Sequence, residues 1–192
     1  MLNDYWNDEY AIEVWQAMVE LLDGNEIGAA AWLGNMCWES GVCPYRVQGK
    51  NYEQSYTYTT GTVRNQSRSE FVGDSTGGGG YSLMQWTYST RKGWYYDYCG
   101  QSLLGDSDNS KGYLIYEMET YYSTVLDHLK NATDINSETE YLMRSSYIGS
   151  ETTHLANRQQ MARNAYEDFS GTPPPPPLGI PYWLLFKFKH LL

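Results

Sequence analysis

The stretch Gly34-Asn35-Met36-Cys37-Trp38-Glu39-Ser40-Gly41 decides the fold. It closes a run of small helix-forming residues that begins at Glu26, and a glycine after Ser40 is typical of a helix end. Glu39 is therefore expected in the last turn of an apolar helix, beside Trp38. Burial and the negative end of the helix dipole both disfavour an ionised carboxylate, so this side chain is expected to stay protonated and to act as a general acid. The alternative is an exposed glutamate at a helix end.

Composition limits the class of protein. The 192 residues are enough for one compact domain and a tail, and 41% hydrophobic with 19% charged residues is not a disordered composition. The net charge of −10 argues against a nucleic-acid partner and against binding of the main domain to an anionic membrane, since both need a basic face. The 19 tyrosines and 7 tryptophans suit either a surface that stacks on sugar rings or an aromatic core.

Cysteine and histidine are too few and too scattered to support other chemistries. Three cysteines predict no disulfide framework; either Cys37 and Cys43 form one bridge, or the thiols are reduced and buried. A cysteine hydrolase would need one of these two with His128 or His154, and no local signature joins them. No cluster has the spacing of metal ligands, so we expect no metal and no cofactor.

Apolar residues recur at helical spacing through most of the chain. Asn25 is placed to cap the helix that ends with Glu39. Between residues 56 and 63 the pattern changes to aromatic and β-branched residues, which predicts a hairpin. The predicted fold class is mainly α, with a small β-hairpin insert after the helix that carries Glu39. The expected helices span residues 8–22, 26–40, 89–99, 112–130, 137–147 (started by a Ser137–Glu140 capping box) and 151–169.

The C-terminal part of the sequence differs from the body. Residues 1–170 form the expected domain, residues 171–177 a proline-rich linker with an extended rod at Pro173–Pro177, and residues 178–192 an apolar, locally basic tail. An exposed apolar segment usually has a partner, so docking on another protein is favoured over folding back or membrane contact. The tail is too short to span a bilayer, no run of 18 apolar residues occurs in the chain, and the N-terminus shows no apolar signal core.

Three segments occur in an order that resembles a known superfamily. Glu39-Ser40, Ser82-Leu83-Met84-Gln85 and Ala165-Tyr166 are similar to the Glu-Ser, Gly-Leu-Met-Gln and Ala-Tyr motifs of goose-type lysozymes and soluble lytic transglycosylases. Gly34–Gly41 and Gly80–Trp86 resemble the phage tail lysozyme family more closely still. The resemblance covers roughly residues 7 to 169. Ser82 departs from the pattern, because the transglycosylases usually carry glycine there.

The resemblance implies a lysozyme-like helical fold and cleavage of the β-1,4 bond between N-acetylmuramic acid and N-acetylglucosamine in bacterial peptidoglycan. Glu39 would be the general acid, and no cofactor is implied. The residues expected to hold the substrate or stack on its sugars are Ser40, Tyr81, Ser82, Gln85, Trp86 and Tyr166.

Hydrolysis usually needs a second carboxylate, whose distance from the first sets the stereochemistry. The insert between the first two motifs offers Glu53, Glu70 and Asp74. Asp74 is the first choice and Glu70 the second. If none of them faces Glu39, a transglycosylase route is favoured, in which the muramoyl 6-hydroxyl closes a 1,6-anhydro ring. The sequence leaves the two routes open.

The family likeness predicts an enzyme of the phage virion, at the tail tip or knob, that is made in the bacterial cytoplasm and opens the cell wall as the genome is delivered. The C-terminal tail would then dock on neighbouring phage tail proteins. An endolysin for host lysis is an alternative with the same chemistry. A non-catalytic, glycan-binding structural protein of the virion is the alternative from another class.

Overall fold

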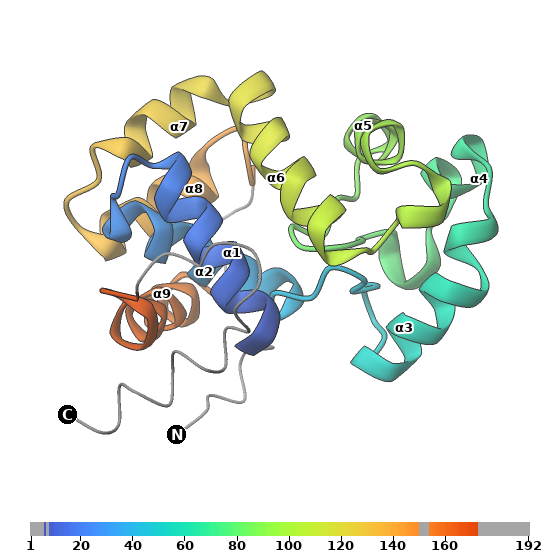
Figure 1. Cartoon of the computed structure of the whole chain (residues 1–192), viewed down its shortest axis with the longest axis horizontal. Coiled ribbons are helices and arrows are strands. Elements are labelled where there is room, and N and C mark those ends of the chain that lie inside the picture. The colour runs from blue at the N-terminus through green and yellow to red at the C-terminus, as the bar shows by residue number, and fades with distance from the viewer. Residues whose placement is uncertain (1–5, 7, 150–153, 173–192) are drawn as a thin grey trace, which may run out of the picture.

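The computed structural model describes Trp6 and residues 8–149 and 154–172, and this part of the chain is mainly helical (Figure 1). The expected mainly α fold is confirmed. No helix in the described ranges is long and apolar enough to cross a membrane. Short 3-10 turns lie at Val63–Asn65, Thr76–Gly78 and Gln101–Leu103. The α-helices are α1 (Asp8–Leu21), α2 (Glu26–Ser40), α3 (Tyr52–Gly61), α4 (Arg68–Gly73), α5 (Ser89–Cys99), α6 (Ser107–Tyr121), α7 (Ser123–Lys130), α8 (Ile135–Arg144) and α9 (Leu155–Phe169).

The helices form two groups that α6 connects (Figure 1). One group holds α1, α2, α7, α8 and α9, and α2 contacts the other four. The second group holds α3, α4 and α5. α6 contacts α1 and α7 on one side and α5 on the other. The C-terminal end of α2, which carries Glu39, points toward the second group (Figure 1).

Small residues allow α2 to occupy the centre of its group. A Cβ atom at Gly34 would lie 2.6 Å from the Cβ of Ala162 on α9. A Cβ atom at Gly28 would lie 2.5 Å from the backbone oxygen of Leu129 on α7. Both distances are shorter than real side-chain contacts, so the neighbouring helices approach α2 this closely only because the side chains are absent.

The predicted β-hairpin at residues 56–63 is wrong, because α3 occupies this stretch and the described residues contain no β-strand. A complete capping box starts the helix. Asn51 Oδ1 accepts from the backbone N–H of Gln54 at 2.8 Å, and Gln54 Oε1 accepts from the backbone N–H of Asn51 at 3.1 Å. Ser55 and Thr59 then lie one turn apart on the buried face of the helix. Local capping and burial outweigh the β propensity of this segment.

Helix boundaries match the predictions for α1, α2 and α5 and differ elsewhere. The helix predicted at residues 112–130 is two helices, because Tyr122, with φ of −131°, interrupts the helical backbone between α6 and α7. α8 begins after Asp134, whose side chain accepts from the N–H of Ser137 at 2.8 Å, so the capping box predicted with Glu140 is wrong.

One further difference from the prediction lies in the second group of helices. α4 was not predicted, although Ser67 and Glu70 form a capping box at its start. The proline rod at Pro173–Pro177 and the tail at residues 178–192 lie outside the described residues.

Candidate active site

Glu39 is the penultimate residue of α2 and lines an open pocket of about 160 Å³. Gly41 ends the helix as predicted: its φ is 65°, and its N–H donates to the backbone oxygen of Cys37 at 2.8 Å. The Glu39 side chain is 23% exposed, so a ligand in the pocket can contact the carboxylate. The other residues that line the pocket are Met84, Gln85, Thr87, Tyr88, Tyr147 and Ile148.

Arg158 of α9 pairs with Glu39, a contact that sequence reasoning missed. Its Nη2 donates to Glu39 Oε1 at 2.5 Å, and its Nη1 donates to Asn35 Oδ1 at 3.1 Å. The expected apolar surroundings of the carboxyl group are therefore wrong, since a guanidinium is its direct neighbour. A signal was present in the sequence, because the arginine falls in line with the buried apolar residues of α9, which are Ala162, Ala165 and Phe169.

Gln85 lines the same pocket as Glu39, from the loop that precedes α5. Its Nε2 donates to the backbone oxygens of Ser82 at 3.0 Å and Arg46 at 3.2 Å. Its backbone is left-handed, with φ of 49°. This conformation is costly for a residue other than glycine, and such residues cluster at functional sites. The loop therefore fixes the direction of the Gln85 amide.

Two serines that were expected to bind substrate hold this loop in place. Ser40 is buried, and its Oγ donates to the backbone oxygen of Leu83 at 2.7 Å, which joins the end of α2 to the loop. Ser82 is buried with φ of 66°, and its N–H donates to the backbone oxygen of Arg46 at 2.8 Å. A left-handed backbone suits glycine best, which gives a physical reason for glycine at this position of the motif.

Tyr81 and Trp86 are core side chains, 3% and 1% exposed. Tyr81 forms isolated β-bridges with Val47 and Trp86, and its hydroxyl hydrogen-bonds to Thr59 Oγ1 at 3.0 Å. Neither ring presents a face to a sugar, so the expectation that they stack on substrate is corrected: they stabilise the loop from inside. At the pocket itself the exposed ring is that of Tyr88, which is 72% exposed.

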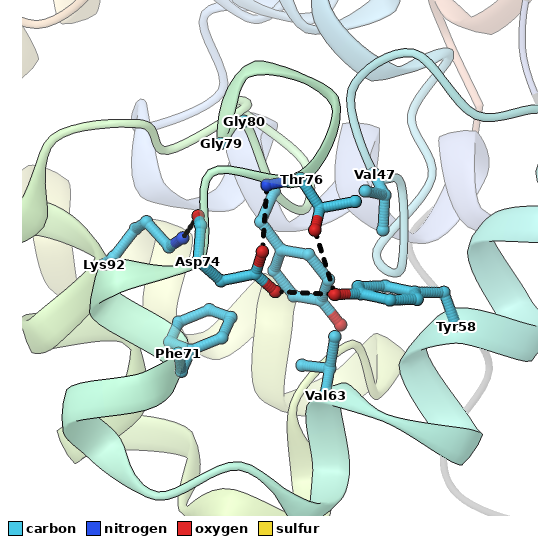
Figure 2. Close-up of a pocket in the computed structure, with 10 residues that line it drawn as sticks. Val47, Tyr58, Val63, Phe71, Asp74, Thr76, Gly79, Gly80 and Lys92 are labelled. Carbon is cyan, nitrogen blue, oxygen red and sulfur yellow. Dashed lines mark hydrogen bonds between the residues drawn. The ribbon is translucent and has the colours of Figure 1, made fainter.

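Asp74 lies in a separate, small pocket between α3, α4 and the glycine-rich segment Gly77–Gly80 (Figure 2). Its carboxylate accepts hydrogen bonds from Tyr58 Oη at 2.9 Å, Gln66 Nε2 at 3.0 Å and the N–H of Thr76 at 2.9 Å. Burial disfavours its ionised form, but these donors outweigh burial and lower the pKa of Asp74 to about 2. Lys92 Nζ donates to the backbone oxygen of Asp74 at 2.7 Å. The carboxylate thus connects the segments around it.

Glu70 and Tyr166 also lie outside the set of residues that line the Glu39 pocket. The Glu70 carboxylate accepts from the hydroxyl of Ser67 at 2.6 Å and from its N–H at 2.7 Å, and these bonds lower the pKa of Glu70. Tyr166 is half-buried against the core. Among the described residues that line the pocket, Glu39 is the one carboxylate. The structure does not bring either predicted second carboxylate to it.

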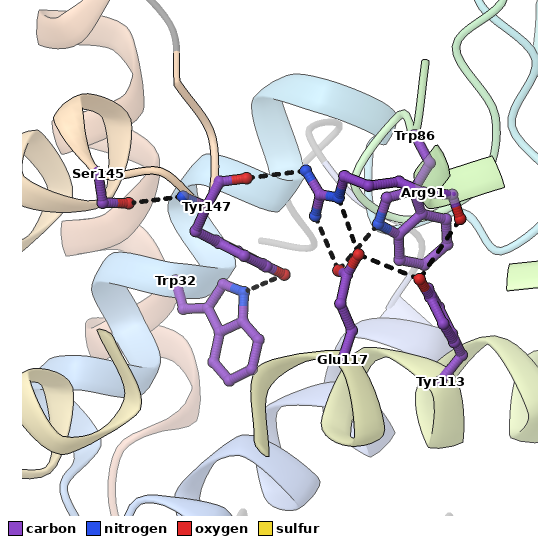
Figure 3. A network of polar contacts seen from close by, with 7 residues as sticks. All are labelled: Trp32, Trp86, Arg91, Tyr113, Glu117, Ser145 and Tyr147. Carbon is purple, nitrogen blue, oxygen red and sulfur yellow. Dashed lines mark hydrogen bonds and ion pairs between the residues drawn. The ribbon is translucent and has the colours of Figure 1, made fainter. Parts of the chain in front are cut away.

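A buried network holds one wall of the pocket (Figure 3). Arg91 Nε and Nη2 donate to the two carboxylate oxygens of Glu117 at 2.8 and 2.7 Å. Arg91 Nη1 donates to the backbone oxygen of Tyr147 at 2.8 Å, and Trp32 Nε1 donates to the Tyr147 hydroxyl at 3.2 Å. Because Tyr147 lines the pocket, the network fixes that wall. Sequence reasoning missed this network, since its members are far apart in the chain.

The cysteines are buried thiols outside any disulfide, which is one of the two states expected from the sequence. Burial raises the pKa of Cys37 and of Cys99 to about 12, and that of Cys43 to about 11. Their thiolate fraction near neutral pH is therefore small, which disfavours a cysteine nucleophile. The described residues contain no group of three or more His, Cys, Asp or Glu side chains that could hold a metal ion.

A helical domain whose central helix ends in a carboxylate, with a glutamine amide in the same pocket, has the features of the lysozyme-like class. The sequence model of the phage tail lysozyme family matches residues 9–169, and the chain belongs to this family. It is therefore a phage-associated, lysozyme-like enzyme of the bacterial cell wall. No curated protein and no solved structure matches the chain.

Proposed function

We propose that this chain is a virion-associated peptidoglycan glycosidase that cleaves the β-1,4 bond between N-acetylmuramic acid and N-acetylglucosamine, with Glu39 as the general acid. The observation that carries the proposal is the position of Glu39, at the end of the central helix and in one pocket with Gln85. The exposed ring of Tyr88 at this pocket offers a surface on which a sugar can stack.

In the proposed reaction Glu39 acts twice. Its carboxyl group first gives a proton to the glycosidic oxygen as the bond from that oxygen to C1 breaks, so that the leaving sugar departs as an alcohol. A hydroxyl group then adds to C1, and its proton passes to the Glu39 carboxylate. Gln85 orients this hydroxyl group by accepting a hydrogen bond from it at Oε1, because Gln85 Nε2 already donates to the backbone oxygens of Ser82 and Arg46.

The nucleophile of the second step separates two routes. A hydrolase of the usual kind places a second carboxylate about 5 to 9.5 Å from the acid. The pocket has one carboxylate among its described residues, which favours the transglycosylase route. There the nucleophile is the 6-hydroxyl of the muramoyl residue itself, and the product carries a 1,6-anhydro ring.

Digestion of purified peptidoglycan by the wild type and by Glu39→Gln, read by mass spectrometry, tests the proposal. We expect fragment release to fall by a factor of about 10² to 10⁴ in the variant. Fragments with a 1,6-anhydro end identify a transglycosylase, and fragments with a reducing end identify a hydrolase. Glu140→Gln is the matched control, since Glu140 also pairs with an arginine, Arg144, at 2.7 Å. Equal fragment release by Glu39→Gln and the wild type would reject the proposal.

The second carboxylate has its own test. Asp74→Asn and Glu70→Gln are both expected to keep the wild-type product pattern per folded molecule, because neither side chain lines the Glu39 pocket. Loss of turnover in one of them, with an intact fold by circular dichroism, would restore that residue as the second carboxylate and favour hydrolysis.

The proposal also assigns a place of action. We place the enzyme at the tail tip or knob of the virion, where it opens the cell wall locally as the genome is delivered, and assign residues 178–192 to docking on neighbouring phage tail proteins. Family membership supports a phage enzyme, while the tail segment lies outside the described residues. Particles that incorporate a chain lacking residues 178–192 at normal copy number would reject the docking.

A further inference from the structure

Packing does not explain why an arginine lies inside the α2–α9 contact. The Arg158 side chain is 6% exposed, and its Nε is buried without a hydrogen-bond partner among the described residues. A buried guanidinium with an unsatisfied donor destabilises a protein, and apolar side chains often serve a core better. A charge buried at this cost points to a functional role, and the Arg158 guanidinium lies against Glu39.

Three helices orient the guanidinium. Asn35 Nδ2 donates to the backbone oxygens of Ala31 at 3.0 Å and Thr139 at 3.2 Å, which leaves Asn35 Oδ1 to accept a hydrogen bond. Arg158 Nη1 donates to this oxygen at 3.1 Å, while its Nη2 donates to Glu39. α2, α8 and α9 together thus hold a positive charge beside the carboxylate, as expected of preorganised electrostatic stabilisation.

Few other titratable groups face Glu39. The phenols of Tyr88 and Tyr147 line the same pocket, and burial raises the pKa of Tyr147 well above its usual value, so that ring is neutral. His154, which precedes α9, packs against Trp38 with 4.7 Å between ring centroids and the ring planes tilted by 30°. Among the described residues, Arg158 is the cation in an ion pair with Glu39.

We propose that Arg158 is a positioning residue that stabilises the Glu39 carboxylate left by the first proton transfer and holds it for the second. A guanidinium stabilises a carboxylate far more than a neutral carboxyl group, so it acts on this intermediate state of the cycle. The inference rests on the proposed function, because that function gives Glu39 both proton transfers.

The proposal predicts a pH dependence with a definite sign. Turnover begins with protonated Glu39 and so falls as the pH rises. Arg158 lies against the Glu39 carboxylate, so its removal is expected to extend turnover to higher pH. Without Arg158, the pH at which activity falls on the alkaline side is expected to rise by about one unit or more. On the acidic side, kcat is expected to drop about tenfold, because the carboxylate formed in the first step lacks its partner. The two profiles therefore cross.

The experiment measures kcat on purified peptidoglycan across both limbs for the wild type, Arg158→Gln and Arg158→Lys. The lysine variant keeps the charge but has no planar guanidinium to contact Asn35 and Glu39 together. We therefore expect its activity to fall at the same alkaline pH as that of the wild type, with a reduced kcat. Arg163→Gln is the matched control: Arg163 is on the same helix and hydrogen-bonds to Asn136 and Gln160. Its profile is expected to match the wild type.

Carbon-13 NMR of the glutamate carboxyl groups gives a readout that does not depend on turnover. The titration midpoint of Glu39 is expected to rise in Arg158→Gln and to stay in Arg163→Gln. A rise with a wild type that releases no fragments would support the charge coupling and reject the proposed function. Unmoved profiles and titrations, with activity lost only in proportion to folded protein, would make Arg158 a packing residue and overturn the proposal. Arg158→Lys keeps the test open if the glutamine variant does not fold.

Discussion

Glu117 and Glu39 each pair with an arginine that is largely buried, and the surroundings of the two carboxylates differ. Glu117 on α6 is 0% exposed and accepts from Arg91 through both oxygens, from Trp86 Nε1 at 3.0 Å and from Tyr113 Oη at 3.1 Å. Glu39 is 23% exposed, and among the described residues its hydrogen-bond donor is Arg158, which contacts Oε1. The first carboxylate is enclosed by protein donors, and the second lies at a pocket.

The difference separates a structural ion pair from a chemically available one. Burial disfavours the charge on Arg91, but Glu117 outweighs this effect and raises the pKa of Arg91 above its usual value. That pair is complete without any ligand, since four hydrogen bonds occupy the Glu117 oxygens. In the Glu39 pair, no described residue donates to Oε2, and that oxygen can contact a substrate. A fully satisfied carboxylate stabilises the fold, whereas a partly satisfied one can exchange protons.

Glu117→Gln should have the largest effect on stability and lower the free energy of unfolding by about 3 to 5 kcal/mol. The new amide NH₂ would face N–H donors, and Arg91 would lose its buried counter-charge. The same change at Glu39 should cost about 1 to 2 kcal/mol, because water in the pocket screens that pair. Urea denaturation near neutral pH measures both values. Equal losses would remove the distinction between the two pairs.

Ser40→Ala tests the hydrogen bond between α2 and the loop that carries Gln85. We expect a loss of about 1 to 3 kcal/mol, because the buried backbone oxygen of Leu83 loses its hydroxyl donor. Turnover per folded molecule should also fall, since this bond joins the Glu39 helix to the Gln85 loop. Unchanged stability and turnover, by denaturation and peptidoglycan digestion, would show that the bond does not position the site.

Asp74→Asn should have the smallest effect, about 1 kcal/mol near neutral pH after allowance for the partial exposure of Asp74. Because the folded-state pKa of Asp74, about 2, lies below the ordinary 3.8, its carboxylate stabilises the fold above that range. The stabilisation is lost as the pH falls from about 3.8 to about 2, so the variant and the wild type should converge there. Denaturation curves at several acidic pH values measure this, and a difference that persists at the acidic end would point to packing.

Helices with strong local signals could be predicted from the sequence, and the others could not. Asn25 and Gly41 marked the ends of α2 correctly, because a cap and a left-handed glycine are local features. The prediction of a β-hairpin at residues 56–63 was wrong, because it followed the β-branched and aromatic residues and overlooked the capping box of Asn51 and Gln54. The break at Tyr122 could not be predicted, because no glycine or proline in the sequence marks it.

The residues of the candidate site also include some that the sequence predicts and some that it does not. The order of the motifs correctly suggested that Glu39 and Gln85 share a pocket. Arg158 could not be placed from sequence reasoning alone, because its contact with Glu39 joins residues far apart in the chain. Asp74 was chosen for its nearness to the glycine-rich segment, and nearness in sequence did not bring it to the pocket. Tyr81 was chosen as an aromatic ring in a motif, and its ring is needed in the core.

The absence of a side chain at Gly34 bears on the chemistry of the site. Ala162 packs so tightly there that a Cβ on Gly34 would come within 2.5 Å of its backbone nitrogen, and Arg158 lies one turn earlier on α9. The distance between the axes of α2 and α9 therefore determines how closely the guanidinium approaches Glu39. A single added methyl group would push the two helices apart and lengthen the ion pair between Arg158 and Glu39, so Gly34 contributes to the geometry of the site as well as to the packing.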